Sequence, residues 1–399
     1  MPVTASLASL QSRIEPPVDV DPAPIAAEPI LALDGLRGLA ILLVLGHNFE
    51  IIGDSAGRVG HAVTLALDLG WIGVQLFFVL SGFLITRILL ATQESPRYYR
   101  SFYVRRMLRI FPLYYAVLFL TFVVWPRIGQ LPPGYAEDQQ NQAWMWLYLS
   151  NWVQPSGLAG KAFPHFWSLA VEEQFYLVWP ALIHRMRWDR VLKWCLAIAA
   201  LSLLGRIFMV AMHASSEAVY MWTTSRMDAL ALGAAAAAFV SSPYGLRRLA
   251  GRGDALFWSA AALSLIGFAL TRGYPRTSPL GQTLGYSWLS VTFAVLVLAA
   301  ATPPRKGDHG SALWRNVLCS KPLRTLGMYS YGMYIFHKPL HDLIGSAMLR
   351  EAGLNAGADY PVALAYVALA TAATLVLAML SYHFLERRFL NLKQRFAPR

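Results

Sequence analysis

The chain has 399 residues, of which 56% are hydrophobic and only 14% are charged, and its formal net charge is +12. Soluble globular proteins are roughly 45–50% apolar and about 25% charged, whereas disordered chains are polar and rich in charge. The composition therefore excludes both classes and favours a membrane protein with several spans. A positive balance in such a protein is typical of basic loops kept on the cytoplasmic side, so it does not indicate nucleic acid as a partner.

Residues 1–29 hold six prolines and four acidic residues, with no apolar core behind a basic flank. This pattern is not that of a signal peptide and predicts a disordered cytoplasmic tail. We expect one transmembrane domain over residues 30–390 and a basic cytoplasmic tail over 391–399. The two cysteines, Cys195 and Cys319, belong to no ligand motif, so we expect neither a disulfide framework nor a metal site.

Ten apolar runs follow the tail, most of them near the roughly 20 residues with which a helix crosses a bilayer. They cover approximately 31–53, 71–91, 111–125, 166–184, 191–212, 225–241, 255–271, 283–302, 324–348 and 361–384. The sequence therefore predicts an all-α membrane protein with about ten transmembrane helices.

The number of lysine and arginine residues alternates between high and low in successive connections. The even-numbered connections and the C-terminal tail hold 22 of these residues, whereas the odd-numbered connections hold six. Because basic loops stay on the cytoplasmic side, this alternation predicts that both termini are cytoplasmic and that the protein is a multi-pass protein of the cytoplasmic (inner) membrane.

The first span contains three ionisable side chains, which are costly at membrane depth and therefore mark candidate functional residues. Asp34 and Arg37 are neighbours on one helix face, and they could form a simple packing ion pair. His47 lies ten residues beyond Arg37, or about 15 Å along a helix, so the two side chains cannot touch. His47 could be a histidine that only bridges two helices, or it could be a catalytic base.

The fourth span places Ser168, Glu172 and Tyr176 on one helix face, with Glu173 about 100° away and therefore the weaker candidate. We expect Glu172 to lie at the depth of His47, where a carboxylate could orient the imidazole for acid–base chemistry. A place on a proton-coupled transport path is the competing interpretation of Glu172.

Other charged pairs occur at the ends of the spans. Arg106 and Arg109 share a helix face and suit phosphate binding, although a basic anchor at the cytoplasmic boundary would look the same. Arg226 and Asp228 enter the sixth span and His337 lies inside the ninth, and each could serve structure alone.

Several segments together resemble acyltransferase family 3, a family of integral-membrane acyl-CoA-dependent O-acyltransferases. The similar segments are Asp34-Gly35-Leu36-Arg37-Gly38 with His47, Phe77-Phe78 with Ser81-Gly82-Phe83, Arg106 with Arg109, Trp167-Ser168-Leu169 with Glu172, Thr223 with Arg226, Asp228, Leu230 and Gly233, and Ser330-Tyr331 with Tyr334, His337 and Pro339. They occur in the family's order between about 31 and 390. Glu386-Arg387-Arg388 departs from the closing Glu-Lys/Arg-Pro of many members.

The resemblance implies transfer of an acyl group, usually acetyl in this family, from cytoplasmic acyl-CoA to a hydroxyl of a surface or exported carbohydrate. It implies His47 as catalytic and Arg106 and Arg109 as donor-binding, and we expect Arg37 beside them. Acyl-CoA is then a co-substrate and no cofactor is permanently bound. Some members carry an extra esterase-like domain, which we expect to be absent.

Our sequence-based hypothesis is that Glu172 orients His47, which deprotonates the acceptor by direct attack or through an acyl-histidine. Asp34, Ser168, Tyr176, Arg226, Asp228 and His337 are expected to support the site. Acylation of a small molecule such as a macrolide and proton-coupled export are the alternatives.

Overall fold

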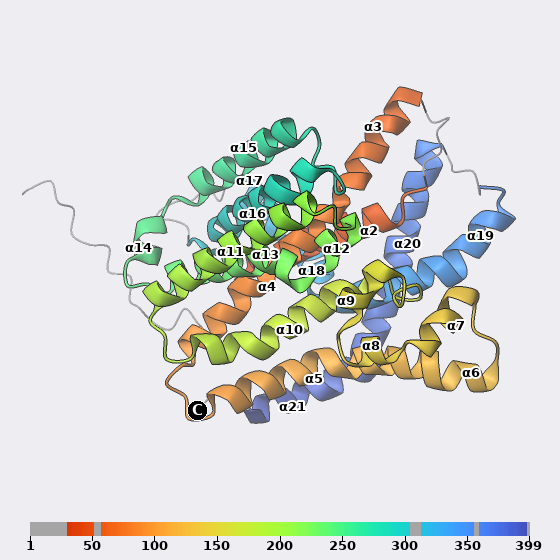
Figure 1. Cartoon of the computed structure of the whole chain (residues 1–399), viewed down its shortest axis with the longest axis horizontal. Helices are drawn as coiled ribbons and strands as arrows, with labels where there is room; N and C mark the ends of the chain where they lie inside the picture. Colours follow the sequence, from red (N-terminus) through yellow and green to blue (C-terminus); the bar gives the residue numbers. More distant parts are fainter. Residues whose placement is uncertain (1–29, 52–56, 304–312, 355–358, 397–399) are drawn as a thin grey trace, which may run out of the picture.

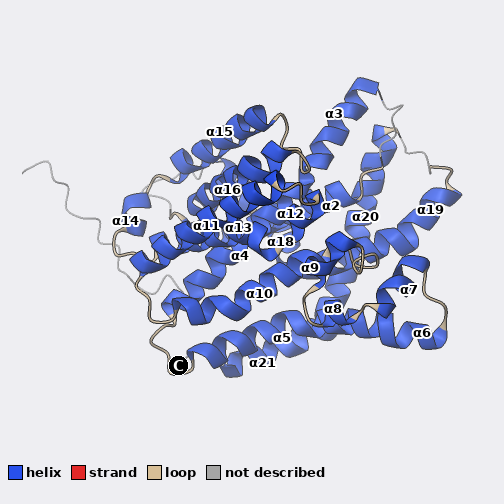
Figure 2. Ribbon diagram, in the orientation of Figure 1, coloured by secondary structure: helices blue, strands red, loops and turns tan. Residues whose placement is uncertain are grey.

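The computed structural model describes residues 30–51, 57–303, 313–354 and 359–396, so the N-terminal tail and residues 397–399 of the basic tail lie outside it. The described residues form helices and no strand (Figure 2). The long helices are α2 (Leu31–Asn48), α3 (Gly57–Asp68), α4 (Ile72–Ala91), α5 (Tyr98–Phe119), α10 (Phe166–Ile183), α11 (Trp188–Ala211), α13 (Thr223–Val240), α15 (Gly253–Thr271), α16 (Tyr286–Ala301), α18 (Lys321–Leu340) and α20 (Tyr360–Ser381).

Short helices fill the connections. They are α6 (Trp125–Ile128), α7 (Pro133–Gln140), α8 (Ala143–Trp146), α9 (Ser150–Val153), α12 (Ser216–Met221), α14 (Gly245–Leu249), α17 (Leu313–Leu318), α19 (Ser346–Glu351) and α21 (Arg387–Leu392). Single turns of π-helix or 3₁₀-helix extend several of the longer ones. They are η1 (Leu69–Trp71), η2 (Leu120–Val124), η3 (Gln154–Ser156), η4 (Gly281–Gly285), η5 (His341–Gly345), η6 (Tyr382–Glu386) and η7 (Lys393–Phe396).

Each of the ten apolar runs falls on one of the long helices, which confirms the all-helical class. Within the described chain, seven helical stretches are long and apolar enough to cross a membrane: Leu31–Asn48, Gly57–Ala91, Tyr98–Ile128, Trp188–Ala211, Gly253–Thr271, Gly281–Ala301 and Tyr360–Phe396. Helices α10, α13 and α18 are not among them, and each carries charged side chains inside its apolar run. The number of ten spans and the cytoplasmic side of both termini stay predictions.

Helices α4 and α13 cross at the centre of the molecule with their backbones in direct contact (Figure 1). A Cβ added to Gly82 would lie 1.9 Å from the carbonyl oxygen of Leu230, and one added to Gly233 would lie 2.0 Å from that of Val79. Small residues permit this approach, which gains van der Waals contact that apolar lipid cannot supply by itself. The glycines of two sequence motifs thus pack against each other's helices.

Helices α2 and α18 approach in the same way. A Cβ on Gly38 would lie 2.0 Å from the carbonyl oxygen of Leu323, and one on Gly327 would lie 1.9 Å from that of Asp34. The contact brings the turn that carries Asp34 and Arg37 beside the turn of α18 that carries Ser330. The glycines around Arg37 therefore position that arginine against α18.

The long connection 126–165 folds over one end of α5 through the short helices α6 to α9 (Figure 1). The hydroxyl of Tyr114 donates to the carbonyl oxygen of Met145 at 2.8 Å, and that of Tyr115 donates to Trp146 at 3.1 Å. Within the connection, a carboxylate oxygen of Asp138 accepts the backbone N–H of Ala162 at 2.7 Å. Burial raises the pKa of this carboxyl group. These bonds fix the entry to α10, on which Ser168 and Glu172 lie.

Candidate active site

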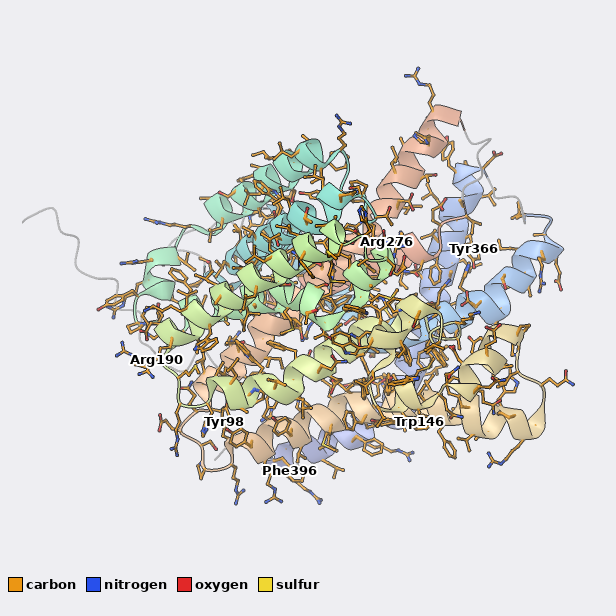
Figure 3. The ribbon with its side chains drawn as sticks, in the orientation of Figure 1. Tyr98, Trp146, Arg190, Arg276, Tyr366 and Phe396 are labelled. Atoms are coloured by element: carbon orange, nitrogen blue, oxygen red, sulfur yellow. The ribbon has the colours of Figure 1, made fainter. Side chains whose placement is uncertain are left out.

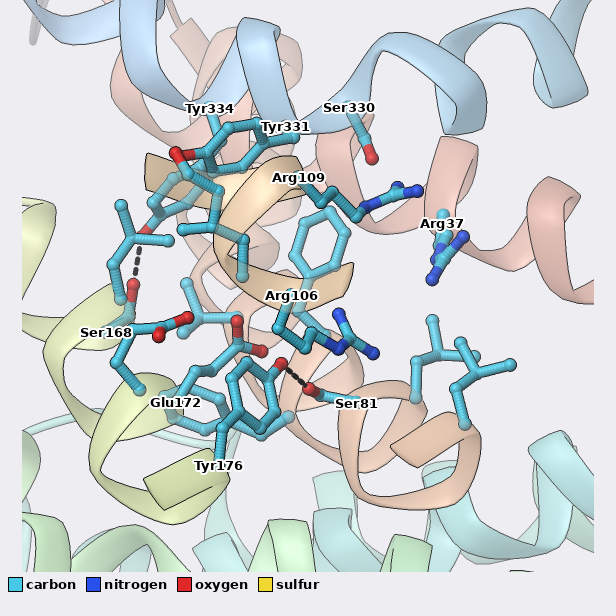
Figure 4. Close-up of a pocket in the computed structure, with 18 residues that line it drawn as sticks. Arg37, Ser81, Arg106, Arg109, Ser168, Glu172, Tyr176, Ser330, Tyr331 and Tyr334 are labelled. Carbon is cyan, nitrogen blue, oxygen red and sulfur yellow. Dashed lines mark hydrogen bonds between the residues drawn. The ribbon is translucent and has the colours of Figure 1, made fainter. Parts of the chain in front are cut away.

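A cavity of about 110 Å³ lies between α2, α4, α5, α10 and α18, and we call it the inner cavity (Figure 4). Its polar and charged lining consists of Arg37, Ser81, Arg106, Arg109, Ser168, Glu172, Glu173, Tyr176, Ser330, Tyr331 and Tyr334. A cavity of this size holds several water molecules or a small acyl group. Three cations and two carboxyl groups gathered among apolar helices are the strongest candidate for chemistry in the described chain.

The three arginines gather on one side of the inner cavity, and Ser168 and Glu172 lie toward the other (Figure 4). Arg106 and Arg109 share one face of α5, as their spacing predicts, and the Cζ atom of Arg106 lies 4.9 Å from the centre of the Tyr176 ring. Arg37 reaches them from α2. The structure thus brings together all three residues predicted to bind the donor.

A second cavity of about 220 Å³ adjoins the first. We call it the outer cavity to distinguish it from the first, although it lies at the end of α2 that is predicted to face the cytoplasm. Arg37, Arg109 and Tyr331 line both cavities, and the outer cavity adds Asp34, Arg324, Met328, Tyr382, Glu386 and Leu390. A side-chain nitrogen of Arg37 lies 3.5 Å from a carboxylate oxygen of Asp34, so Asp34 holds one of the shared arginines from the outer side. Three guanidinium groups against two carboxylates leave the outer cavity positive.

Hydroxyl groups link the helices around the carboxylates of the inner cavity. Ser81 of α4 is hydrogen-bonded to Tyr176 of α10, and Ser168 of α10 is hydrogen-bonded to Tyr334 of α18 at 2.6 Å. Glu172 and Glu173 both line the cavity, although Glu173 was predicted to be the weaker candidate because it points about 100° away on the helix. Ser168, Glu172 and Tyr176 do share the cavity, as their four-residue spacing predicts.

His47 does not line the inner cavity with Glu172, so the expected His47–Glu172 pair is absent from the structure. The carboxylate beside His47 is Asp68, at the end of α3, with 3.8 Å between the imidazole Nδ1 and a carboxylate oxygen. That distance is longer than a hydrogen bond, but the Asp68 side chain is 61% exposed and free to approach. The pairing failed because equal depth on two helices does not fix the direction in which either side chain points.

Arg226 and Asp228 take different partners. Asp228 forms a fully buried ion pair with Arg206 of α11 at 2.7 Å, and it also accepts from Ser287. Arg226 donates to Gln75 and is surrounded by the aromatic rings of Phe78, Trp167, Tyr220 and Tyr286, whose centres lie 4.6–5.8 Å from its Cζ atom. Both residues therefore fasten α13 to its neighbours, and neither lines the inner cavity.

His337 is fully buried near the far end of α18 and lies outside the inner cavity. Its Nδ1 atom is 2.7 Å from the carbonyl oxygen of Tyr334, and because a carbonyl only accepts, Nδ1 carries the proton. Its ring centre lies 4.6 Å from that of His165, and its Nε2 atom has no hydrogen-bond partner among the described residues. This histidine pair adjoins the cavity through Tyr334.

Sequence reasoning missed Asp68, Arg206 and Gln75, and it ranked Glu173 below Glu172. Asp68 stands just before the second apolar run, where an acidic residue reads as an ordinary polar connection. Arg206 could have been identified from the sequence, because it is the one arginine inside the apolar run of α11. The free-energy cost of a charge at that depth requires a partner for it.

Comparison with known proteins decides the family. The sequence profile of the acyltransferase domain matches residues 30–383, which is most of the chain. The protein belongs to acyltransferase family 3. The match covers α2 to α20 and therefore includes every helix that lines the inner cavity.

Relatives with related names come from three bacteria. YrhL of Bacillus subtilis, named as a candidate peptidoglycan O-acetyltransferase, is 30% identical over 90% of this chain and 54% of its own length. The peptidoglycan O-acetyltransferase OatA of Listeria monocytogenes is 28% identical over 89% of this chain and 55% of its own length. The O-acetyltransferase OatA of Staphylococcus aureus is 28% identical over 89% of this chain and 56% of its own length. The chain thus spans about half the length of these relatives, and no solved structure matches it.

Proposed function

We propose that this protein is an integral-membrane O-acetyltransferase that moves an acetyl group from cytoplasmic acetyl-CoA to a hydroxyl of a cell-wall carbohydrate. The observation that carries the proposal is the pair of adjoining cavities that share Arg37 and Arg109. The family membership and the names of the relatives support the reaction class.

The cavities suit the two ends of an acyl-CoA. The outer cavity is positive, and its guanidinium groups can each bind phosphate oxygens through two parallel hydrogen bonds. The inner cavity has room for an acyl group. In this proposal the phosphates remain with Arg37, Arg109 and Arg324, and the pantetheine arm passes through the inner cavity beside Ser168 and Glu172 and carries the thioester toward His47.

The acid–base role is assigned to His47, with Asp68 as the residue that orients it. His47 lies ten residues beyond Arg37 on the same helix, or about 15 Å, a separation comparable to the length of an extended pantetheine arm. A general base takes the proton from the acceptor hydroxyl as its oxygen attacks the thioester carbon. The C–S bond then breaks, an ester forms, and the proton passes to the sulfur to give free CoA.

The acceptor assignment rests on the relatives, two of which carry peptidoglycan in their names. His47 lies near the end of α2 that the arginine alternation predicts to face outward. Glycan hydroxyls outside the membrane are therefore the acceptor class, and transfer runs from the cytoplasmic to the outer side.

The full chain in proteoliposomes, supplied with radiolabelled acetyl-CoA and soluble peptidoglycan strands, tests this function. The expected result is label on the glycan that mild base removes, together with stoichiometric free CoA. The His47→Ala protein, inserted to the same level, should give neither product. A well-folded wild-type protein that neither releases CoA nor labels the glycan would contradict the proposal.

A further inference from the structure

A basic groove lies at one end of the helical bundle, away from both cavities. It is lined by Gln93, Glu94, Ser95, Pro96, Arg97, Tyr98, Tyr99, Arg100, His184, Arg185, Met186 and Arg187. These residues come from the connection between α4 and α5 and from the connection between α10 and α11. The groove shares no lining residue with the inner or outer cavity.

The two walls of the groove are fastened together. The amide of Gln93 donates to the carbonyl oxygen of Met186 at 2.9 Å, and the hydroxyl of Tyr98 donates to that of Pro180 at 3.1 Å. The ring of Tyr98 stacks on His184 with 4.5 Å between centres. The groove is therefore held by bonds between its walls and is not a chance gap between mobile loops.

Four exposed arginines face this groove, two from each wall: Arg97 and Arg100 from one, Arg185 and Arg187 from the other. Glu94 is the one acidic residue in the lining, and Asp189 pairs with Arg187 at 3.2 Å. The lining thus carries an excess of positive charge. Opposed pairs of guanidinium groups suit a ligand with two phosphates, one for each pair.

Arg185 is one of five non-glycine residues in the described chain with a positive φ. Its φ is +60°, in the left-handed region that costs energy for any residue with a Cβ, and glycine would fill this turn without strain. Arg185→Gly would therefore relax this turn and remove the charge in one substitution.

The position of the groove identifies the source of the phosphates. Tyr98, Arg190 and Phe396 lie at the same end of the molecule, opposite Trp146 and Tyr366 (Figure 3). The groove lies where α4 and α10 end and where α5 and α11 begin. Tyr98, Tyr99 and the nearby Trp188 lie there, and aromatic rings are typical of the headgroup level. Arg97 precedes Arg109 by twelve residues, about 18 Å along α5, which is far from the proposed donor phosphates.

We infer that this groove binds the headgroup of an anionic phospholipid of the cytoplasmic leaflet, and that a lipid with two phosphates, of the cardiolipin type, binds more tightly than one with a single phosphate. Basic pockets between helices on the cytoplasmic side suit such headgroups. The lipid bridges the two connections and joins α5, which carries the donor arginines, to α10, which carries Glu172.

The test uses the full-length protein, purified and mixed with phosphatidylcholine nanodiscs that contain either cardiolipin or phosphatidylglycerol, with bound lipid counted by native mass spectrometry. Retained cardiolipin in excess over phosphatidylglycerol is expected for the wild-type protein. Arg97→Gln with Arg185→Gln should weaken retention about thirtyfold, given the usual contribution of each basic residue near a membrane surface. Arg247→Gln with Arg248→Gln, which removes two exposed arginines from another connection, should leave it unchanged.

A further variant separates the lipid site from a structural role. Arg185→Gly relieves the strained turn, so it should keep or raise the melting temperature while it lowers cardiolipin retention. Equal loss in the Arg247/Arg248 control, absence of any preference for anionic lipid, or displacement of the lipid by acetyl-CoA or inorganic phosphate would overturn the inference. The measurement counts bound lipid and no product, so its failure would leave the proposed acyl transfer untouched.

Discussion

Arg37 and Arg109 line both cavities, although the two residues lie more than 70 positions apart in the sequence. The two guanidinium groups therefore stand between the two cavities. A ligand with a phosphate head and an acyl end can occupy both spaces at once and contact both arginines.

Arg109→Ala should weaken acetyl-CoA binding about 10- to 100-fold, because it removes hydrogen bonds to a phosphate, and Arg106→Ala should weaken it less, because Arg106 lines only the inner cavity. The fall should appear mainly in KM, with a smaller change in kcat. Arg105→Ala is the matched control, since Arg105 lies on the same helix but lines neither cavity. Donor affinity that is unchanged in the first two variants would show that the pair is only a topological anchor.

His47→Ala should lower kcat about 10²- to 10⁴-fold, the usual contribution of a positioned acid or base. Asp68→Asn should lower it less, because the imidazole keeps its place and loses only the charge that orients it. His61→Gln on the exposed face of α3 is the control. Kinetics at saturating acetyl-CoA separate the cases, and full activity in His47→Ala would remove this residue from the mechanism.

Gly82→Ala should destabilise the protein by about 1–3 kcal/mol or more, because its methyl group would lie 1.9 Å from the carbonyl oxygen of Leu230. Gly205→Ala is the matched control, since nothing lies within 4 Å of a Cβ added there. That substitution should be neutral or stabilising. Melting temperatures in detergent compare the two, and equal values would argue against the close crossing of α4 and α13.

Asp228→Asn should destabilise the fold by about 3–5 kcal/mol, because it leaves Arg206 as a buried charge without its counter-ion. The double variant Arg206→Met/Asp228→Leu should recover much of that loss. The exposed pair of Arg187 and Asp189 offers a comparison, for which removal of one partner should cost about 1 kcal/mol or less. A double variant as unstable as Asp228→Asn would refute this account of the pair.

Much of this site was predictable from the sequence because helical spacing fixes which side chains share a face. Arg106 and Arg109 on α5, and Ser168, Glu172 and Tyr176 on α10, meet in the inner cavity as their spacing predicts. The rest depends on how helices rotate and cross. Nothing in the sequence shows that Glu172 turns toward the arginines, that His47 turns toward Asp68, or that Arg206 of α11 neutralises Asp228 of α13.

The glycines show the same limit of prediction from sequence. Gly38, Gly82 and Gly233 belong to sequence motifs, but only the structure shows that each lies against the backbone of another helix. Each permits a helix crossing, and the crossings together determine where the cavity forms.

The most direct test of the central claim is photolabelling of the full-length protein with an acyl-CoA whose acyl chain carries a diazirine. If the acyl group enters the inner cavity, label will fall on peptides of α10 around Ser168–Tyr176 and of α18 around Ser330–Tyr334. Excess acetyl-CoA will abolish the label, and the Arg109→Ala substitution will reduce it. Label that falls on other helices, or that persists in the presence of excess acetyl-CoA, would contradict the account.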